Sequence, residues 1–386
     1  MLLAATCQAQ QIHLWQNRKG VAVAANADRL WQYNRYEHSR WGLGLTATYA
    51  PPDKSRTTHQ VDAWGGWGVE DKQLKGGLCY SLHTKRSANT TDISLAIADD
   101  VFPSGGLTLA THAEGFNAVV SNLGRSLMTH QQKAEAALAI KHARTTYGLS
   151  ATLFSEQRLY DSIGLLYGQG ARHYRGLDLT ATVAWPQGLE ATIALTLADH
   201  AATTAIKGLL QYHKQLQRRL LTTRIAAHAG ACSPNVWQHR RFCLGGSNGM
   251  LLASDQAMAT VWPDEFWADA FALCMVRVQT TSPLFSLYNA NVMIGLVPTP
   301  FATLKAMWGT LWNATPGGHI VDDGIDMQAP YNGLIEVGMG IDGLLRWGFS
   351  DWGVGVAMRL APRSASYFKA ELSANMAFTL SARLWL

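Results

Sequence analysis

Polar and apolar residues alternate over segments of about ten residues along most of the chain, with turn residues between the segments. In the stretch LDLTATVAW, one face of an extended chain would carry Leu177, Leu179, Ala181, Val183 and Trp185. Because side chains of a β-strand point alternately to the two faces of its sheet, this period of two predicts a strand. Similar runs recur almost from end to end, so we predict an all-β chain of antiparallel strands.

Turn residues between the runs favour hairpins. Pro186, Gln187 and Gly188 join two alternating runs, and such residues are typical of tight connections. The run from His130 to Arg144 contains good helix formers but also alternates, and we assign it as a strand. Counting the runs predicts about 16 strands. The longest interruption, 231–267, predicts a long loop, and loops of such length are often functional.

Composition changes the environment expected for these strands. Only 15% of the residues are charged, whereas soluble proteins carry about 25%, so much of the surface is expected not to face water. No apolar run reaches the roughly 18 residues of a membrane helix. A chain that crosses a bilayer without helices must do so as a closed barrel. We therefore predict a transmembrane antiparallel β-barrel over 11–386, its long loop folded inward at about 231–267. The alternative is a soluble β-rich protein.

The net charge and the N-terminal segment say less about the function of the chain. The net charge is +5, but Lys and Arg are scattered, so we predict no nucleic-acid partner. The tightest group, 214–219, is expected to be a solvated strand end or an interfacial anchor. Residues 1–10 are too short for a complete signal peptide and are assigned as a signal remnant or an N-terminal tail.

The five cysteines, at positions 7, 79, 232, 243 and 274, show no C-x-x-C spacing, and we predict structural thiols without metal or other cofactor. Two alternatives stay open. Cys232 and Cys243 are close enough along the chain for a loop disulfide in an oxidising compartment. Zinc held by His228, Cys232, His239 and Cys243 would use spacings that match no familiar module.

A short motif inside the long loop carries a resemblance to a known family. Phe242, Leu244, Gly245 and Gly246 are similar to the F-x-L-G-G motif of the BamA-like bacterial surface-antigen superfamily of outer-membrane barrels. That superfamily includes the mitochondrial sorting-and-assembly barrel subunit. The resemblance runs from the long loop to the C-terminus and includes the Pro283-Leu284 pair. It implies insertion or assembly of other β-barrel proteins, with the lipid bilayer, client β-barrel proteins and accessory assembly subunits as partners.

The sequence departs from the family pattern at an expected ion pair. Leu251 and Leu252 stand where the family has Arg-Gly. In the wall motif that receives the arginine, Gly309 and Trp312 match, but Met307 replaces the acid. Exchanging both members of a buried ion pair for apolar residues can be nearly neutral. Our hypothesis is that Leu251 packs near Met307 and keeps the loop inside the barrel.

The last strand supplies a second group of candidate residues. The family mechanism implies that edge strands offer unpaired backbone groups to a client strand, as any exposed sheet edge would. At the closing strand this seam would contain Phe378, Leu380, Leu384 and Leu386. The ending TLSARLWL resembles the mitochondrial β-signal, with Ser381 in place of Gly. It favours a mitochondrial over a bacterial outer membrane.

Two other functions stay open. Gly245–Gly249 fits the G-x-S-x-G pattern of a hydrolase, in which Ser247 would be the nucleophile. Asp264 or Asp269 followed by His319 would supply the remaining members in the required order. The charged segment before the motif is unlike the buried strand that such a site needs, so we predict no enzyme. A barrel of 16 strands is also wide enough for a passive pore.

Overall fold

The protein is described by a computed structural model that covers residues 11–17, 20–26, 29–34, 36–51, 56–86, 89–103, 128–159, 173–198, 204–237, 240–244, 258–261, 265–289, 294–314, 319–322, 325–347, 350–360 and 376–384. These ranges contain β-strands, turns and loops but no α-helix. Within them no helix is long and apolar enough to cross a membrane. The predicted N-terminal tail, 1–10, lies outside the described residues.

The chain divides into two compact units. The first contains the chain up to Leu209 together with Cys232–Arg240, and the second contains Leu210–Ala231 together with Arg241–Leu386. The single barrel over 11–386 and the number of about 16 strands stay predictions.

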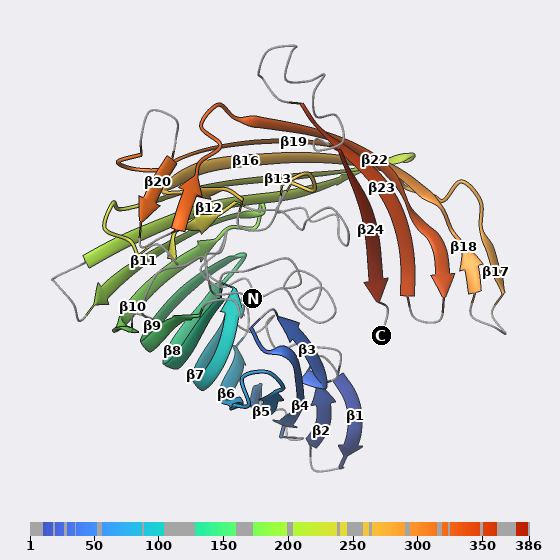
Figure 1. Cartoon of the computed structure of the whole chain (residues 1–386). Coiled ribbons are helices and arrows are strands. Elements are labelled where there is room, and N and C mark those ends of the chain that lie inside the picture. The colour runs from blue at the N-terminus through green and yellow to red at the C-terminus, as the bar shows by residue number, and fades with distance from the viewer. Residues whose placement is uncertain are drawn as a thin grey trace. The chain divides into compact units, whose positions relative to one another are not determined.

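In the first unit, most strands that follow one another in the sequence pair as antiparallel neighbours, whereas the second and third strands both pair with the fourth (Figure 1). Its strands are β1 (Gln11–Gln16), β2 (Val21–Asn26), β3 (Trp31–Asn34), β4 (His38–Tyr49), β5 (Thr57–Gly68), β6 (Leu74–Arg86), β7 (Asn89–Pro103), β8 (Met128–His142), β9 (Thr145–Leu159), β10 (His173–Ala184) and β11 (Leu189–Ala198). β12 (Thr204–Gln217) begins in this unit and ends in the second.

The second unit continues the antiparallel pattern, and its wall strands pair in the order β13, β16, β19, β22, β23 and β24. Its strands are β13 (Leu221–Cys232), β14 (Phe242–Cys243), β15 (Trp267–Ala268), β16 (Ala270–Thr280), β17 (Leu287–Asn289), β18 (Ile294–Leu296), β19 (Thr299–Thr310), β20 (His319–Asp322), β21 (Ile325–Gln328), β22 (Leu334–Trp347), β23 (Ser350–Leu360) and β24 (Met376–Leu384). β14 pairs with β15 and β20 with β21 as small separate ribbons. The prediction of an all-β antiparallel fold is confirmed.

Several local predictions are also confirmed. The ambiguous run 130–144 forms most of β8 and the turn that precedes β9. The turn at Pro186–Gly188 closes the hairpin of β10 and β11, with Trp185 N donating to Leu189 O at 2.8 Å. Gly188 has a φ of +86°, which a residue without Cβ adopts easily. The long loop begins after β13, and Phe242–Cys243 is its only strand among the described residues between 233 and 266.

Apolar side chains lie on one face of the strands and polar side chains on the other, with the apolar face more exposed. In β9, Leu149 and Leu153 are 60% and 61% exposed, whereas Phe154 and Glu156 on the opposite face are buried. In β19, Leu304 and Trp308 are exposed while Lys305 and Met307 between them are buried. A water-soluble sheet normally buries its apolar face, so this inverted order is typical of strands whose outer face meets lipid.

The buried polar face of the first unit is held by ion pairs. Glu37 is fully buried and accepts hydrogen bonds from Arg40 Nε at 3.0 Å and Nη2 at 2.6 Å. Lys75 Nζ lies 2.8 Å from the same carboxylate and also pairs with Asp71. Arg40 pairs in addition with Asp100. Because each buried charge has an opposite charge beside it, the cost of removing these groups from water is offset.

The cysteines provide a test of which face meets lipid. Cys274 is exposed between the buried residues Leu273 and Met275 of β16, so it belongs to the outward face. In a protein reduced to this one cysteine and placed in vesicles, a charged maleimide should react with it at least about tenfold more slowly than with a cysteine introduced as Arg144→Cys in an exposed turn. Thiol labelling requires the thiolate, which lipid disfavours. Equal labelling rates, measured by mass shift, would show that water reaches both positions.

Candidate functional site

The long loop returns to the wall of the second unit at its aromatic residue. Phe242 is fully buried, and its ring centroid lies 4.7 Å from that of Phe271 in β16. On β13, a Cβ placed on Gly230 would come within 2.7 Å of Phe242 Cζ. The glycine therefore leaves the space that the phenylalanine ring fills. Sequence reasoning identified Phe242, but it did not identify Gly230 or Phe271 as its partners.

Leu244 brings the predicted loop motif and the predicted wall motif together. A Cβ on Gly309 would lie 3.0 Å from Leu244 Cδ1 and 3.1 Å from Ala268 Cβ, so Leu244 lies directly on the glycine backbone. The backbone holds it there, because Leu244 N donates to Phe266 O at 2.8 Å. Gly309 is on the face of β19 that is opposite to the exposed residue Trp308. The loop is thus fastened to the inward face of this unit.

The other predicted wall residues lie close to this contact. Met307 is buried on the same face and pairs in register with Leu273 and Leu334. Trp312 N donates to Asp269 Oδ2 at 2.7 Å, and the other oxygen of this buried carboxylate lies 3.3 Å from Arg241 Nε. Gly245, Gly246 and Leu251 lie outside the described residues. The proposed packing of Leu251 near Met307 therefore stays a hypothesis.

A buried acid holds the segment that follows the undescribed part of the loop. Glu336 of β22 is fully buried, and its Oε2 accepts hydrogen bonds from Thr260 N at 2.8 Å and Thr260 Oγ1 at 2.7 Å. Lys305 Nζ lies 3.5 Å from the other oxygen. Arg359 Nη2 donates to Thr260 O at 2.8 Å and Nη1 to Glu265 at 3.2 Å. Both flanks of 245–257 are thereby fixed within the second unit.

In the first unit, an arginine fastens the start of the same loop. Arg240 donates to Glu156 through Nε at 2.9 Å and Nη2 at 2.7 Å, and to both oxygens of Asp178 through Nη1 at 2.8 and 2.9 Å. Its guanidinium carbon lies 3.9 Å from the ring centroid of Phe154. Lys207 Nζ donates to the carbonyl of Arg240 at 2.8 Å. We call Arg240, Glu156 and Asp178 the arginine clamp.

Strand geometry explains why the clamp residues converge. Phe154 and Glu156 of β9 point to the same polar face as Asp178 of β10, which pairs in register with Thr196 of β11. Thr196 Oγ1 donates to Asp178 at 2.6 Å and so orients that carboxylate. Burial of the guanidinium opposes its charge, but Glu156 and Asp178 raise the pKa of Arg240 above its ordinary value. The arginine therefore stays charged at every physiological pH.

Trp237 completes the attachment of this loop segment. Its ring centroid lies 4.4 Å from that of Tyr174 and 6.1 Å, edge to face, from that of Phe154. Ser233 N donates to Ile206 O at 2.8 Å, and Asn235 Nδ2 donates to Thr204 O at 2.6 Å. The only sequence signal for this arrangement is the pair of consecutive arginines before Phe242. This signal does not identify the partners of Arg240, because Glu156 is 84 positions away from it in the sequence.

The predicted seam residues lie in β24 as far as they are described. Phe378 is 78% exposed and pairs in register with Val356 of β23. The backbones of Leu380 and Leu384 pair with Val354 and Ser350. Leu386 lies outside the described residues. An outward Phe on a terminal strand suits contact with lipid or with another strand.

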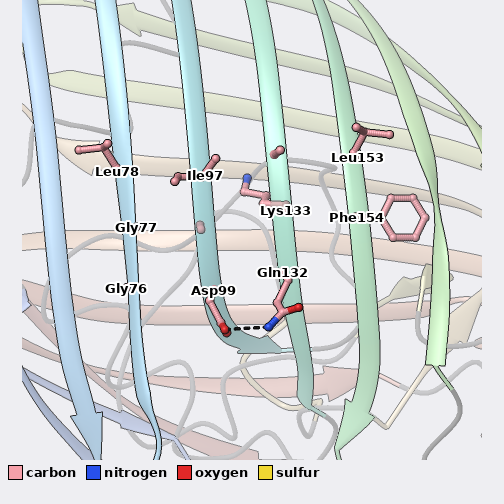
Figure 2. Close-up of a pocket in the computed structure, with 11 residues that line it drawn as sticks. Gly76, Gly77, Leu78, Ile97, Asp99, Gln132, Lys133, Leu153 and Phe154 are labelled. Carbon is pink, nitrogen blue, oxygen red and sulfur yellow. Dashed lines mark hydrogen bonds between the residues drawn. The ribbon is translucent and has the colours of Figure 1, made fainter.

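A shallow depression in the first unit, of about 570 Å³, does not resemble a substrate site. It is lined by Gly76, Gly77, Leu78, Ile97, Ala98, Asp99, Gln132, Lys133, Ala134, Leu153 and Phe154. Figure 2 shows Leu78, Ile97 and Leu153 in one row across β6, β7 and β9, as the strand register requires. Its residues alternate between the two faces of the sheet, and the hydrogen bond drawn there joins Gln132 Nε2 to Asp99 at 3.0 Å. We assign it no ligand.

The alternatives for metal, disulfide and hydrolase sites gain no support. Cys232 and Cys243 are both buried and form no disulfide, so the disulfide alternative is wrong for this structure. No group of three or more His, Cys, Asp and Glu gathers for a metal within the described ranges, and His239 lies outside them. Ser247 and Asp264 also lie outside. Asp269 already accepts a hydrogen bond from Trp312 N and forms an ion pair with Arg241.

Comparison with known proteins gives weak structural similarities alone. No protein-family model and no curated protein matches the chain. The chain is similar to CdiB from Acinetobacter baumannii, with 10% identity, a TM-score of 0.45, and coverage of 89% of this chain and 56% of that one. It is also similar to BamA from Haemophilus ducreyi lacking POTRA domains 1–3, with 8% identity, a TM-score of 0.48, and coverage of 98% and 75%. A third is the outer-membrane transporter YddB from Escherichia coli, with 9% identity, a TM-score of 0.38, and coverage of 97% and 67%. The chain spans little more than half the length of that CdiB chain. At these identities and TM-scores, the similarities assign no family.

Proposed function

We propose that the chain is an outer-membrane β-barrel protein that acts in the insertion or assembly of other β-barrel proteins. The observation that carries this proposal is the seating of Leu244 on Gly309, since it joins the two motifs that the family resemblance singled out. The loop is fastened on both sides of 245–257 by buried groups, at Leu244 and at Thr260. In this proposal the fastened inward loop supports the barrel wall while a client strand is added.

In the proposed mechanism the chain's own edge strands bind the client. An exposed strand edge offers unpaired N–H and C=O groups, and an incoming strand adds to it by backbone hydrogen bonds. The last strand, β24, would serve as this edge, with Phe378 on its outward face. Lipid, client β-barrel proteins and accessory assembly subunits are the partners proposed. The β-signal-like C-terminus favours mitochondria.

Single-channel conductance in planar bilayers tests the proposal. The purified chain should give a fluctuating conductance that a peptide copying the last strand of a client blocks or alters. A scrambled peptide of the same composition is the control. A steady channel that ignores both peptides would contradict the assembly function and favour a passive pore. The absence of any channel would contradict both membrane functions.

Enlarging Gly309 tests the contact that carries the proposal. Gly309→Ala would place Cβ within 3.0–3.2 Å of Leu244, Ala268 and Pro330, and such overpacking costs about 1–3 kcal/mol. We expect a lower free energy of unfolding and a weaker response of the conductance to the client peptide. Gly148→Ala is the matched control, since its nearest contact would be Thr182 Cβ at 3.6 Å. If the response to the peptide were unchanged in Gly309→Ala, the contact between the loop and Gly309 would play no part in client binding.

A further inference from the structure

One edge of the first unit collects exposed positive charge. Exposed cations occur at the short-turn ends of strands β5 to β9, which lie side by side in Figure 1. They are Arg56, Lys85, Arg86, Lys141 and Arg144. We call these five residues the cationic edge. Within the described ranges none of the five forms an ion pair, and the nearest carboxylate along these strands, Asp92, pairs with His83.

Strand pairing makes these cations neighbours. Lys85 N donates to Arg56 O at 2.7 Å, which joins the entry to β5 with the end of β6. Arg86 pairs in register with Asn89, and Asn89 pairs in register with His142 between Lys141 and Arg144. His142 Nδ1 and Asn89 Oδ1 are 2.9 Å apart. The five cations therefore follow one another along a single sheet end.

Apolar side chains stand next to this edge on the outward face. Ile140 pairs in register with Tyr147, and both are exposed. Ile93 is exposed one strand further along. A band of apolar and tyrosine side chains that ends in Lys and Arg is the order expected where a strand leaves the hydrocarbon and enters the headgroup layer.

The opposite ends of the same strands differ in their charges. Acids gather there, among them Glu70, Asp71, Asp99 and Asp100. Most of the cations near them, such as Arg40 and Lys75, are already engaged in ion pairs. The second unit repeats the basic short turn at the hairpin of β12 and β13, where Lys214, Arg218 and Arg219 are exposed. Exposed cations without an ion pair are therefore clustered at the short turns, whereas at the opposite ends they are scattered, as at Lys72 and Arg175.

We propose that the cationic edge binds the headgroups of anionic phospholipids in the leaflet that surrounds the short turns. The inference rests on the membrane location in the proposed function, but not on assembly activity. Each exposed Lys or Arg at a charged membrane surface contributes about a fivefold increase in association. Binding should weaken as salt rises, because charges at an exposed surface are screened within about 10 Å at 0.1 M.

Native mass spectrometry of the full chain, folded in a neutral detergent, tests the proposal. Phosphatidylglycerol should bind more tightly than phosphatidylcholine of the same chain length. The double variants Lys85→Gln/Arg86→Gln and Lys141→Gln/Arg144→Gln should each weaken phosphatidylglycerol binding by about 25-fold. The matched control, Lys72→Gln/Arg175→Gln, removes two exposed cations from the other strand ends and should change binding by less than about twofold. The shift of the unheated band in gel electrophoresis checks that each variant is folded.

Four results would overturn the proposal. Equal binding of the two lipids would do so, and so would equal losses in the edge and control variants. Competition by inorganic phosphate at the lipid's own concentration would show that any small anion suffices, and binding of a polyglutamate peptide in place of the lipid would assign the edge to an acidic protein. Insertion into phosphatidylcholine vesicles is measured separately. A chain that does not insert would contradict the proposed membrane location itself.

Discussion

Replacing Arg240 with Met is expected to lower the free energy of unfolding by about 3–5 kcal/mol. The substitution keeps an unbranched side chain in place of the aliphatic stem but leaves Glu156, which is 3% exposed, and Asp178 without their cation. Burying a carboxylate without a partner costs much more free energy than the intact ion pair contributes to stability. Urea titration of the protein in phospholipid vesicles, followed by tryptophan fluorescence, measures the effect. Trp237 should report it directly, because it packs beside the clamp.

Two further variants make this prediction specific to the charges. In the triple variant Arg240→Met/Glu156→Gln/Asp178→Asn none of the three clamp residues is charged, and most of the lost stability should return, since removing all members of a buried ionic group can be nearly neutral. Arg175→Met removes an exposed arginine from the same unit and should shift stability by no more than about 0.5 kcal/mol. A triple variant as unstable as Arg240→Met would show that packing of the guanidinium, and not its charge, holds the loop.

Placing an arginine on the outward face should destabilise the protein by about 2–4 kcal/mol in a bilayer. Leu149→Arg is the sharpest case, because Leu149 is 60% exposed and lies between the outward residues Leu138 and Ala181 of its neighbouring strands. On a surface that faces water, the same exposure would make the change nearly neutral, within about 0.5 kcal/mol. The same vesicle titration measures it.

The matched substitution on the inward face separates lipid exposure from the general effect of adding an arginine. Thr180 belongs to the polar face of β10 and pairs with Ser150 and Ala194. Thr180→Arg should therefore cost markedly less than Leu149→Arg. If the two variants were equally stable, the outward apolar face would not be in lipid, and the soluble β-rich alternative would regain support.

The local alternation of apolar and polar residues was sufficient to predict the strands. In β10 the alternation of Leu177 and Leu179 with Asp178 and Thr180 predicts both the strand and the separation of its faces, and the structure confirms both. This works because a strand has a period of two whatever its partners are. The turn at Gly188 was equally evident, since its backbone conformation depends on the residue itself. The low charged fraction indicated, before any fold was known, that the apolar face needed a solvent other than water.

What the sequence left undecided is which distant residues meet. Glu156 and Asp178 were two of many acids at polar positions of alternating strands, and nothing local distinguished them as partners of Arg240. Likewise, the family resemblance directed attention to an acid missing at Met307, while the structure holds the loop through Gly309, Glu336 and the arginine clamp. Such contacts depend on strand register and on the path of the loop, and a slip of one residue would turn every side chain of a strand to the other face. The sequence by itself therefore determined the strands and their faces, and it predicted that the apolar face meets lipid. Only the tertiary structure decided how the loop is fastened, because pairing across 60 to 100 residues is set by packing and not by periodicity.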